Sequence, residues 1–395
     1  MRILHTGDFH AGKNLRGLSR TPEIREALQE ISHLAHTEKV DALLIAGDLF
    51  DTANPTAEAE NAIFEFFIDL KEKGIPSVAI AGNHDSARRL SSLSGLLGWV
   101  GASVVAEVDP KSPLNAVKTL YARDGTPLKI AALPYLSERR LIKHIDLLGG
   151  DVSEWRLKYQ EGMRFFIHYL TQAFSPESVN ILMMHTTIEG SHGSGSESHF
   201  KFDMGNTYTV PTSALPTLAQ YVALGHIHKA QCVVENPPSY YAGSPLQLDF
   251  GEAGDAKSVY LVELDPGRPA HVHPVALSAG RPLKNARLDL DQLDHRMAEL
   301  ESFPGWVKVI LKVPPGAAVS GIRDRILQAL PNVIGVELDR EDLAQTEEVV
   351  SRKHLSTLEL FERFYAEKRG DLPDTVRQAF IEGELEIRQQ QGETV

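Results

Sequence analysis

Five short clusters of acidic, amide and imidazole side chains occur in the first 230 residues, each directly after a run of apolar residues. One such cluster alone is more often a turn or a histidine at the edge of the core. Structural need does not explain why five strands should each end in a metal-binding side chain, whereas a dinuclear site requires that many loops to converge. Together the clusters predict a site for two metal ions. They are Gly7-Asp8-Phe9-His10, Gly47-Asp48-Leu49-Phe50-Asp51, Gly82-Asn83-His84-Asp85, Met184-His185 and Gly225-His226-Ile227-His228.

A dinuclear site needs a bridging ligand, because two cations about 3.5–4 Å apart repel each other. A carboxylate between them offsets the repulsion, and Asp8 or Asp48 could serve. Mixed nitrogen and oxygen ligands accept manganese, iron or zinc, so the residues alone do not select a metal. The role of Asp51 stays open: it is either a further member of the site or a cap for the helix that begins near Thr56.

The elements that must position these clusters alternate between apolar runs and helical patterns up to about Gly280, which predicts a layered α/β domain. Helices are expected over 22–39 and over 56–73, the second with Thr56 as N-cap and Gly74 just beyond its end. The carboxyl ends of neighbouring strands are where α/β sheets carry their sites. Strands are expected around 3–4, 42–46, 78–81, 181–184 and 221–224.

A second unit is expected after Gly280, where strand and helix patterns alternate again: strands over 286–290, 306–313 and 333–338, helices over 292–303 and 320–330. Another helix is expected to open at Asp151. From Ser356 two amphipathic helices follow, and their apolar stripes pack either on this chain's own core or on a partner. The Gly/Ser-rich loop 190–198 is expected to be flexible and receives no role.

Composition narrows the class of protein. No segment of the 395 residues approaches the roughly eighteen apolar residues of a membrane span, and the N-terminus leaves no room for a signal peptide, so a cytoplasmic location is expected. One cysteine excludes an internal disulfide and a Cys-rich zinc module. The net charge of -13 argues against a protein that binds duplex DNA unaided, unless bound cations reverse the sign locally and a partner supplies basic surface.

The order DxH, GDxxD, GNHD, a lone His and GHxH resembles the calcineurin-like metallophosphoesterases. That family implies a β-sandwich flanked by helices. It implies that His84, which is not a ligand there, approaches the scissile phosphate, and Asp85 behind it is expected to fix its tautomer and raise its basicity. One metal would be held by Asp8, His10, Asp48 and His228, and the other by Asp48, Asn83, His185 and His226, with Asp48 as the bridge.

The chemistry implied by this resemblance is phosphodiester hydrolysis. Two divalent cations supply a water nucleophile near neutral pH and balance the charge on the phosphorane oxygens. His84 can stabilise that charge or protonate the leaving 3′ oxygen.

A narrower resemblance, to the SbcD family of nuclease subunits of bacterial SbcCD complexes, rests on five stretches: MRILHTGDFHAG, VDALLIAGDLFDTANPT, VAIAGNHDS, YVALGHIHKAQ and YYAGSPLQLDF. It implies a manganese-dependent nuclease domain over 1–280, a DNA-contacting α+β capping domain over 281–345, and C-terminal helices over 350–395 that bind the coiled coil of the SbcC ATPase. The implied activities are an ATP-dependent 3′–5′ exonuclease on duplex ends and an endonuclease on single strands and hairpins, in DNA repair, recombination and replication. The implied assembly is a homodimer within a heterotetramer.

Two other functions are compatible with parts of the sequence. A stand-alone metallophosphoesterase acting on nucleotides or other small phosphodiesters explains every ligand but leaves the residues after Gly280 without a task. A non-catalytic scaffold with the same fold could lose ligands or His84 without penalty, and this sequence has lost none.

Overall fold

The computed structural model describes residues 1–109, 111–137, 155–194, 209–314 and 320–340, with 361–362, 365, 373, 376–378 and 380. The expected helix start at Asp151, loop residues 195–198 and nearly all of 350–395 lie outside the described residues.

The first of two six-stranded sheets has the order β16-β15-β1-β4-β5-β6. Four of its six strands, β1, β4, β5 and β6, run parallel to one another. Strand β15 pairs antiparallel with both β1 and β16. Three of the expected strands, those near 3–4, 42–46 and 78–81, are confirmed in it. The strands are β1 (Arg2–Thr6), β4 (Ala42–Ile45), β5 (Ser77–Ile80), β6 (Ala102–Val105), β15 (Ser258–Glu263) and β16 (His271–Ala276).

The second sheet has the order β13-β14-β12-β9-β8-β7, and its four inner strands run parallel. It contains the other two expected strands, near 181–184 and 221–224. The strands are β7 (Val117–Tyr121), β8 (Pro127–Leu133), β9 (Val179–His185), β12 (Tyr221–Gly225), β13 (Gln231–Val234) and β14 (Ser239–Tyr241). Two short ribbons join β2 (Asn14–Leu15) to β3 (Leu18–Ser19) and β10 (Thr187–Ile188) to β11 (Thr209–Val210).

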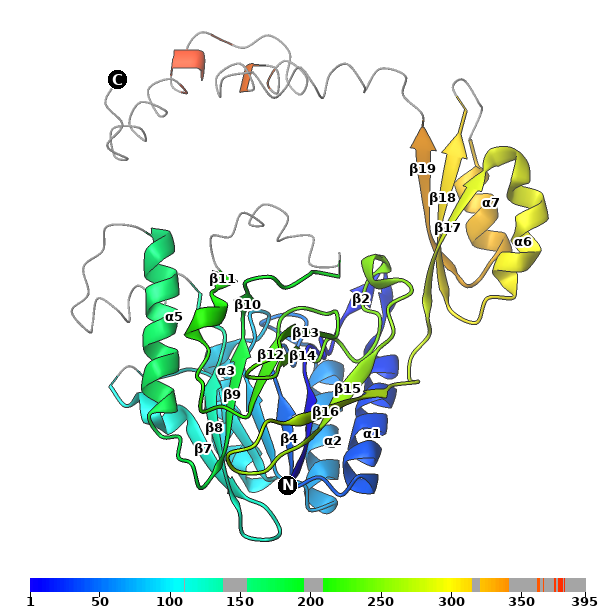
Figure 1. Cartoon of the computed structure of the whole chain (residues 1–395). Helices are drawn as coiled ribbons and strands as arrows, with labels where there is room; N and C mark the ends of the chain where they lie inside the picture. The colour runs from blue at the N-terminus through cyan, green and yellow to red at the C-terminus, as the bar shows by residue number, and fades with distance from the viewer. Residues whose placement is uncertain are drawn as a thin grey trace. The chain divides into compact units, whose positions relative to one another are not determined.

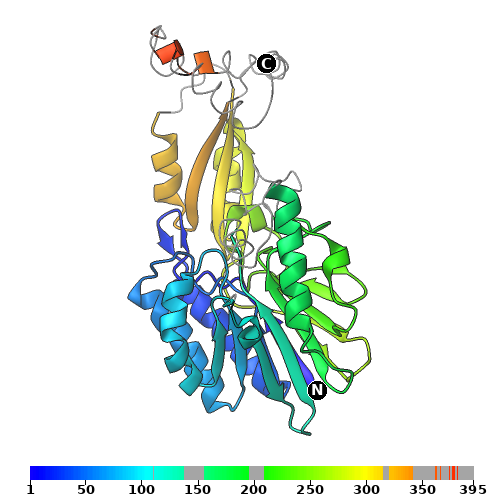
Figure 2. The same ribbon diagram turned by 90° about the vertical axis from the view of Figure 1, so that its left-hand side faces the viewer.

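Helices cover the outer faces of both sheets (Figures 1 and 2): α1 (Thr21–Thr37), α2 (Ala57–Glu72) and α3 (Ala87–Trp99) lie on the first, and α5 (Trp155–Thr171) on the second. Thr56 caps α2 as predicted, because its hydroxyl accepts from the amide of Ala59 at 3.3 Å. Gly74 follows with φ +69°, as a C-terminal glycine does. Short 3₁₀ turns occur at Pro113–Ala116 (η1), Thr212–Ala214 (η3) and Phe250–Glu252 (η4).

The apolar core has two layers because successive side chains of a strand point to opposite faces of its sheet. Ile3 and Leu44 pack with residues of the second sheet, such as Met183. Leu4 and Leu43, their neighbours along the chain, pack with residues of α1 and α2. The result is a helix–sheet–sheet–helix sandwich, which confirms the predicted fold class.

The strand and helix alternation expected after Gly280 is confirmed as β17 (Leu283–Asp289), η5 (Leu290–Gln292), α6 (Leu293–Glu301), β18 (Trp306–Val313), α7 (Ile322–Ala329) and β19 (Val333–Arg340). The strands form a three-stranded sheet in the order β17-β18-β19, with both helices on one face (Figure 1). By its internal contacts the chain forms two units, 1–310 with 321–337 and 311–320 with 338–395. The domain boundaries at 280 and 345 stay predictions.

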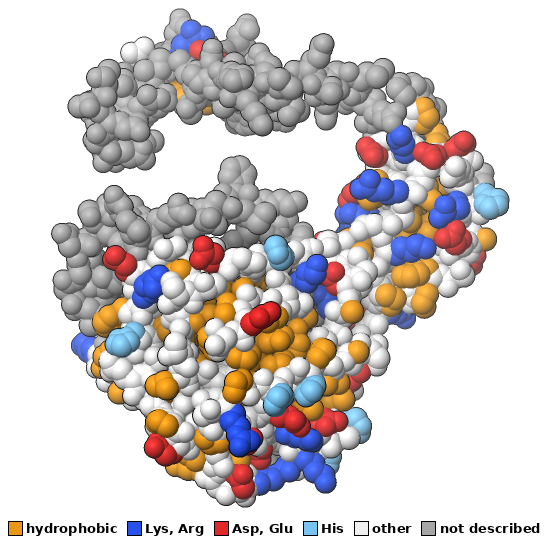
Figure 3. Space-filling model, in the orientation of Figure 1, with side chains coloured by type: hydrophobic (Ala, Val, Ile, Leu, Met, Phe, Trp, Pro, Cys, Tyr) orange, Lys and Arg blue, Asp and Glu red, His pale blue; other side chains and the backbone are white. Residues whose placement is uncertain are grey.

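The described surface carries charges of both signs. Figure 3 shows acidic and basic side chains interspersed on the face toward the viewer, without a continuous basic track on its described part. Across the described ranges, no helix is long and apolar enough to span a membrane.

Candidate metal centre

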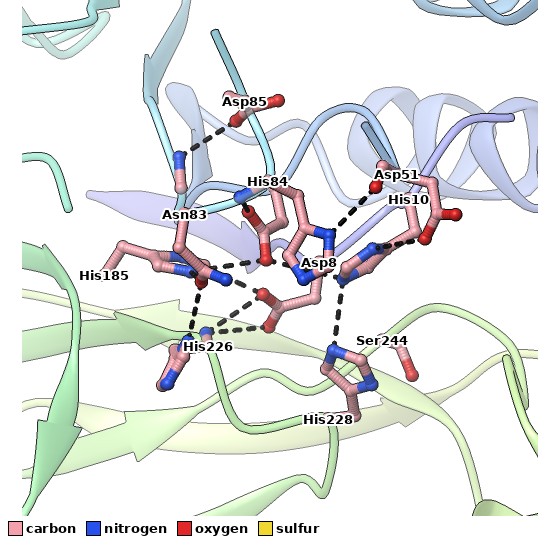
Figure 4. A network of polar contacts seen from close by, with 12 residues as sticks. Asp8, His10, Asp51, Asn83, His84, Asp85, His185, His226, His228 and Ser244 are labelled. Atoms are coloured by element: carbon pink, nitrogen blue, oxygen red, sulfur yellow. Dashed lines mark hydrogen bonds and ion pairs between the residues drawn. The ribbon is translucent and has the colours of Figure 1, made fainter. Parts of the chain in front are cut away.

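The loops that follow β1, β4, β5, β9 and β12 converge at one end of the sandwich, so both sheets contribute to one site (Figure 4). The structure brings together all seven side chains expected as ligands. Asp8, His10, Asp48, His185 and His226 are buried, and the remaining members, Asn83 and His228, are half-buried.

Glycines before the site residues allow this close approach. A Cβ on Gly82 would lie 2.1 Å from Asp48 Oδ1, and one on Gly47 would lie 2.2 Å from His185 Nδ1. Asp8 and Asp48 themselves adopt the left-handed region, with φ of 50° and 49°. Such backbone costs on the order of 1–3 kcal/mol per residue and is typical of functional sites.

Asp48 lies between two groups of expected ligands. Its Oδ2 is 3.4 Å from His10 Nε2 on one side and 3.4 Å from His185 Nε2 on the other. Asp8 lies differently, since both of its carboxylate oxygens accept from the amide of His226, at 2.9 and 3.2 Å. Of the two bridging candidates, the geometry favours Asp48.

The two groups each have the donor atoms of a cation site. In the first, Nε2 of His10 and Nε2 of His228 lie 3.1 Å apart. In the second, Asn83 Oδ1 lies 2.9 Å from both His185 Nε2 and His226 Nδ1. The ligand atoms of Asp8, His10 and His228 all lie within 4.8 Å of one another, and so do those of Asp8, Asp48 and His185. Buried oxygen and nitrogen donors that face each other so closely fit divalent cations.

Hydrogen bonds on the far side of three imidazoles set their tautomers. Nδ1 of His185 donates to the carbonyl of Ala46 at 2.7 Å, and Nδ1 of His10 donates to Asp51 Oδ1 at 3.1 Å. Nδ1 of His228 donates to Glu252 Oε1 at 2.9 Å. In each ring Nε2 is therefore the nitrogen that faces the centre and is left to bind a cation, as in metal-bound histidines.

The electrostatics of the cluster are those of a site short of positive charge. Burial raises the pKa of Asp8 to about 7 and lowers the pKa of His226 to about 3. Burial also lowers the pKa of His185, but the Asp48 and Asp8 carboxylates and the Ala46 carbonyl together outweigh it and raise that pKa to about 9. His185 in turn holds the pKa of Asp48 below its usual range against the opposing effect of burial. A bound cation would supply the charge that a proton on His185 otherwise provides.

His84 points into the cluster from the loop after β5 (Figure 4). Its Nδ1 donates to the backbone carbonyl of Asp51 at 2.8 Å, so Nε2 is the nitrogen that remains for a substrate. Its ring lies 4.7 Å from that of His10, at 74°.

The prediction that Asp85 fixes the tautomer of His84 is wrong. The Asp85 carboxylate accepts from the amides of Leu49, Phe50 and Gly82, at 3.1, 3.0 and 2.9 Å. Three backbone donors hold it between the loops after β4 and β5, away from the imidazole. Asp85 therefore organises the loops, and the carbonyl of Asp51 orients His84.

The open question about Asp51 is also resolved. Thr56 caps α2 by itself, whereas the Asp51 carboxylate accepts from His10 Nδ1 and, at 3.2 Å, from Lys13 Nζ. Asp51 thus orients His10, one of the expected ligands.

Glu252, on η4, is a site residue that the sequence reasoning missed. It is fully buried and accepts from His228 Nδ1, from Ser244 Oγ at 3.0 Å and from Lys257 Nζ at 2.5 Å. The only sequence signal was its position just after the stretch YYAGSPLQLDF, and one glutamate in a loop has no pattern that would single it out.

The fold and the ligand cluster define a metallophosphoesterase, and residues 1–230 match the family described as calcineurin-like phosphoesterase. Residues 279–369 match the family described as the type 5 capsule protein repressor C-terminal domain.

Relatives that match almost the whole chain are named as the D component of the nuclease SbcCD. The one from Bacillus subtilis is 34% identical over 381 residues, which are 95% of each chain. The one from Escherichia coli K12 is 30% identical over 91% of this chain and 89% of the relative. This chain belongs to the SbcD family of calcineurin-like phosphoesterases.

Among solved structures, a dimetal phosphatase from Danio rerio covers 70% of this chain and 99% of its own, with a TM-score of 0.40 and 12% identity. The assignment to a family rests on the sequence matches.

Proposed function

We propose that this protein is the nuclease subunit of an SbcCD-type complex and hydrolyses phosphodiester bonds of DNA with two divalent cations. The proposal of hydrolysis rests on the position of Asp48, whose Oδ2 lies 3.4 Å from an imidazole nitrogen on either side. Support for DNA as the substrate is the 34% identity, over 95% of both chains, to a protein named as a nuclease subunit.

In this proposal Asp48 would be shared by the two cations, and three further side chains would hold each of them. When bound, the cations would supply a water nucleophile at neutral pH and balance charge on the phosphate. Imidazole, carboxylate and amide donors are compatible with manganese, which we propose on the family resemblance. The further ligands are Asp8, His10 and His228 for one cation, and Asn83, His185 and His226 for the other.

The side chain proposed to act on the substrate is His84. With Nδ1 bonded to the carbonyl of Asp51, its Nε2 is available to donate to a phosphate oxygen or to protonate the leaving 3′ oxygen. Asp51 has two tasks here, since its carbonyl orients His84 and its carboxylate orients His10. Asp85 fixes the two loops that carry Asp48 and Asn83.

DNA binding is proposed to depend on partners. A net charge of -13 and the scattered basic side chains of Figure 3 favour a role for an SbcC-like ATPase in binding the DNA, which would also make DNA processing ATP-dependent.

The proposed domains of this chain are a nuclease domain over 1–280, a DNA-contacting domain over 281–345, and residues 350–395 bound to the ATPase coiled coil. We propose a homodimer on the family resemblance, with Leu96 and Trp99 of α3, which are 66% and 84% exposed, as candidate contact residues. We place this assembly in the cytoplasm, with its DNA and ATP.

The test is a manganese-dependent assay on blunt duplex and hairpin DNA, with this chain alone and with its ATPase partner and ATP. We expect cleavage of both substrates by the complex, 3′–5′ degradation of the duplex, and cleavage about 10²-fold slower or more by a complex with His84→Gln. Hydrolysis of a small phosphodiester without cleavage of DNA in any arm would instead identify a stand-alone phosphoesterase.

A further inference from the structure

A cavity of about 170 Å³ lies directly beside the second group of ligands. Its lining includes Gly82 and Asn83 after β5, Ala87 at the start of α3, and Tyr135 and Ser137 after β8. Asn83 belongs to both the cavity lining and the candidate metal centre, since its Oδ1 lies 2.9 Å from His185 Nε2. Whatever occupies the cavity is therefore next to any phosphate held at the metal centre.

Tyr135 is the aromatic wall of this cavity. Its amide donates to the carbonyl of Ala81 at 2.9 Å, which holds the segment after β8 against the end of β5. Its ring lies 6.3 Å from the His226 ring at 26°, and 6.2 Å from the His185 ring at 85°. The side chain is half-buried, so part of the ring stays accessible.

The size and chemistry of the cavity select a small flat group. Pockets that enclose whole drug-sized ligands measure roughly 300–1,000 Å³, so 170 Å³ fits one ring system and not a base pair. Aromatic walls bind nucleobases by stacking, at about 1–3 kcal/mol per base, without preference for one base. The Ser137 hydroxyl, the Asn83 amide and the Asp85 carboxylate add polar groups to the lining that could meet a base edge.

We propose that this cavity binds one unpaired nucleobase of the nucleotide next to the scissile phosphate, and that Tyr135 stacks on it. A base can enter only after it leaves the duplex, at a cost of a few kcal/mol that is smallest at frayed ends and in hairpin loops. The subsite would therefore favour cleavage where bases are already unpaired. This inference rests on the proposed nuclease function and names the group that its site recognises.

The test compares p-nitrophenyl phosphodiesters that share a leaving group and differ in the second alcohol: thymidine through its 5′ oxygen, thymidine through its 3′ oxygen, and methanol. We expect the wild-type protein with manganese to prefer at least one thymidine ester over the methyl ester in kcat/KM. Tyr135→Leu should reduce that preference by about 5- to 150-fold, the range that corresponds to a lost stack. Tyr135→Phe, which keeps the ring, should retain it.

The ratio of kcat/KM for the preferred thymidine ester to kcat/KM for the methyl ester separates stacking from support of the ligands. If Tyr135 only supports His185 and His226, Tyr135→Leu lowers both rates equally and the ratio stays unchanged, which overturns the proposal. Ala87→Leu fills the cavity from α3 without altering Tyr135 and should also reduce the preference. A wild-type protein that hydrolyses all the esters equally well refutes the subsite and leaves the phosphodiesterase intact, whereas failure to cleave DNA counts against the proposed function alone.

A second readout needs no turnover. In a His84→Gln background with manganese, a single strand with terminal 2-aminopurine should lose fluorescence on binding, because the base stacks on a ring. The additional change Tyr135→Leu should abolish this quenching, and Tyr135→Phe should preserve it. Equal quenching in all three proteins would exclude Tyr135 as the stacking surface.

Discussion

Nδ1 of His228 donates to Glu252 Oε1 across 2.9 Å, and this carboxylate, fully buried, also accepts from Lys257. The contact fixes the tautomer in which His228 Nε2 faces His10 Nε2 at 3.1 Å. Partners of this kind are worth about 10- to 100-fold in metal affinity.

We therefore expect Glu252→Gln to weaken binding of one metal by about that factor, while the other remains bound. Metal content after dialysis against graded manganese measures this, and Glu235→Gln, a change at an exposed position, is the control. A lower melting temperature with unchanged metal content would show that Glu252 serves only the fold.

Asp48→Asn should reduce the metal content below two per chain and abolish hydrolysis, because an amide cannot offset two adjacent dications. Elemental analysis and a phosphodiesterase assay check this, with the exposed Asp124→Asn as the control. Two bound metals and full activity would exclude Asp48 as the bridge.

His84→Gln should leave both metals bound while turnover falls by about 10²-fold or more, the scale of a lost acid or transition-state donor. The exposed His33→Gln is the matched control and should behave as wild type. Loss of metal from His84→Gln would mean that His84 is itself a ligand.

Stability should fall in mild acid because of His5, a buried residue of β1 that lies outside the metal cluster. Burial lowers the pKa of His5 from 6.5 to about 3, and its Nδ1 lies 2.9 Å from the hydroxyl of Tyr221. Between these pH values the unfolded chain binds a proton that the folded chain does not. The contribution of neutral His5 to the free energy of unfolding is therefore fully present above pH 6.5. Below pH 6.5 the free energy of unfolding falls by up to about 1.4 kcal/mol per pH unit.

Denaturant unfolding in EDTA at pH 7 and pH 5 checks this contribution. His5→Gln should lose less stability between the two pH values than the wild-type protein, whereas the exposed His273→Gln should lose as much. Equal losses in wild type and His5→Gln would contradict the assignment.

Deletion of residues from Ser356 onward should leave the metal site intact, since no proposed ligand lies beyond His228. We expect the shortened chain to hydrolyse a small phosphodiester but not to co-purify with its ATPase or process duplex DNA with ATP. An insoluble product would assign the apolar stripes to this chain's own core. Full ATPase binding would move the docking surface elsewhere.

The sequence alone determined the strands that carry the site and the side chains at their ends. Buried strands read as apolar runs, and a parallel arrangement brings their carboxyl ends together, so the position of Asp48 or His185 along the chain already implied convergence. Gly47 and Gly82 belong to the same local pattern, because a side chain at either position would collide with the site.

Only the tertiary structure decided which groups orient those side chains. Asp85 is next to His84 in sequence, yet its carboxylate bonds to amides 35 and 36 residues away, and a carbonyl 33 residues away holds the imidazole. Glu252 and Tyr135 reach the centre from strands and turns whose order in the sheets no local pattern specifies. Hydrogen bonds and ring contacts of this kind depend on the direction of each side chain across a folded sandwich, whereas spacing along the chain reports only which residues share an element.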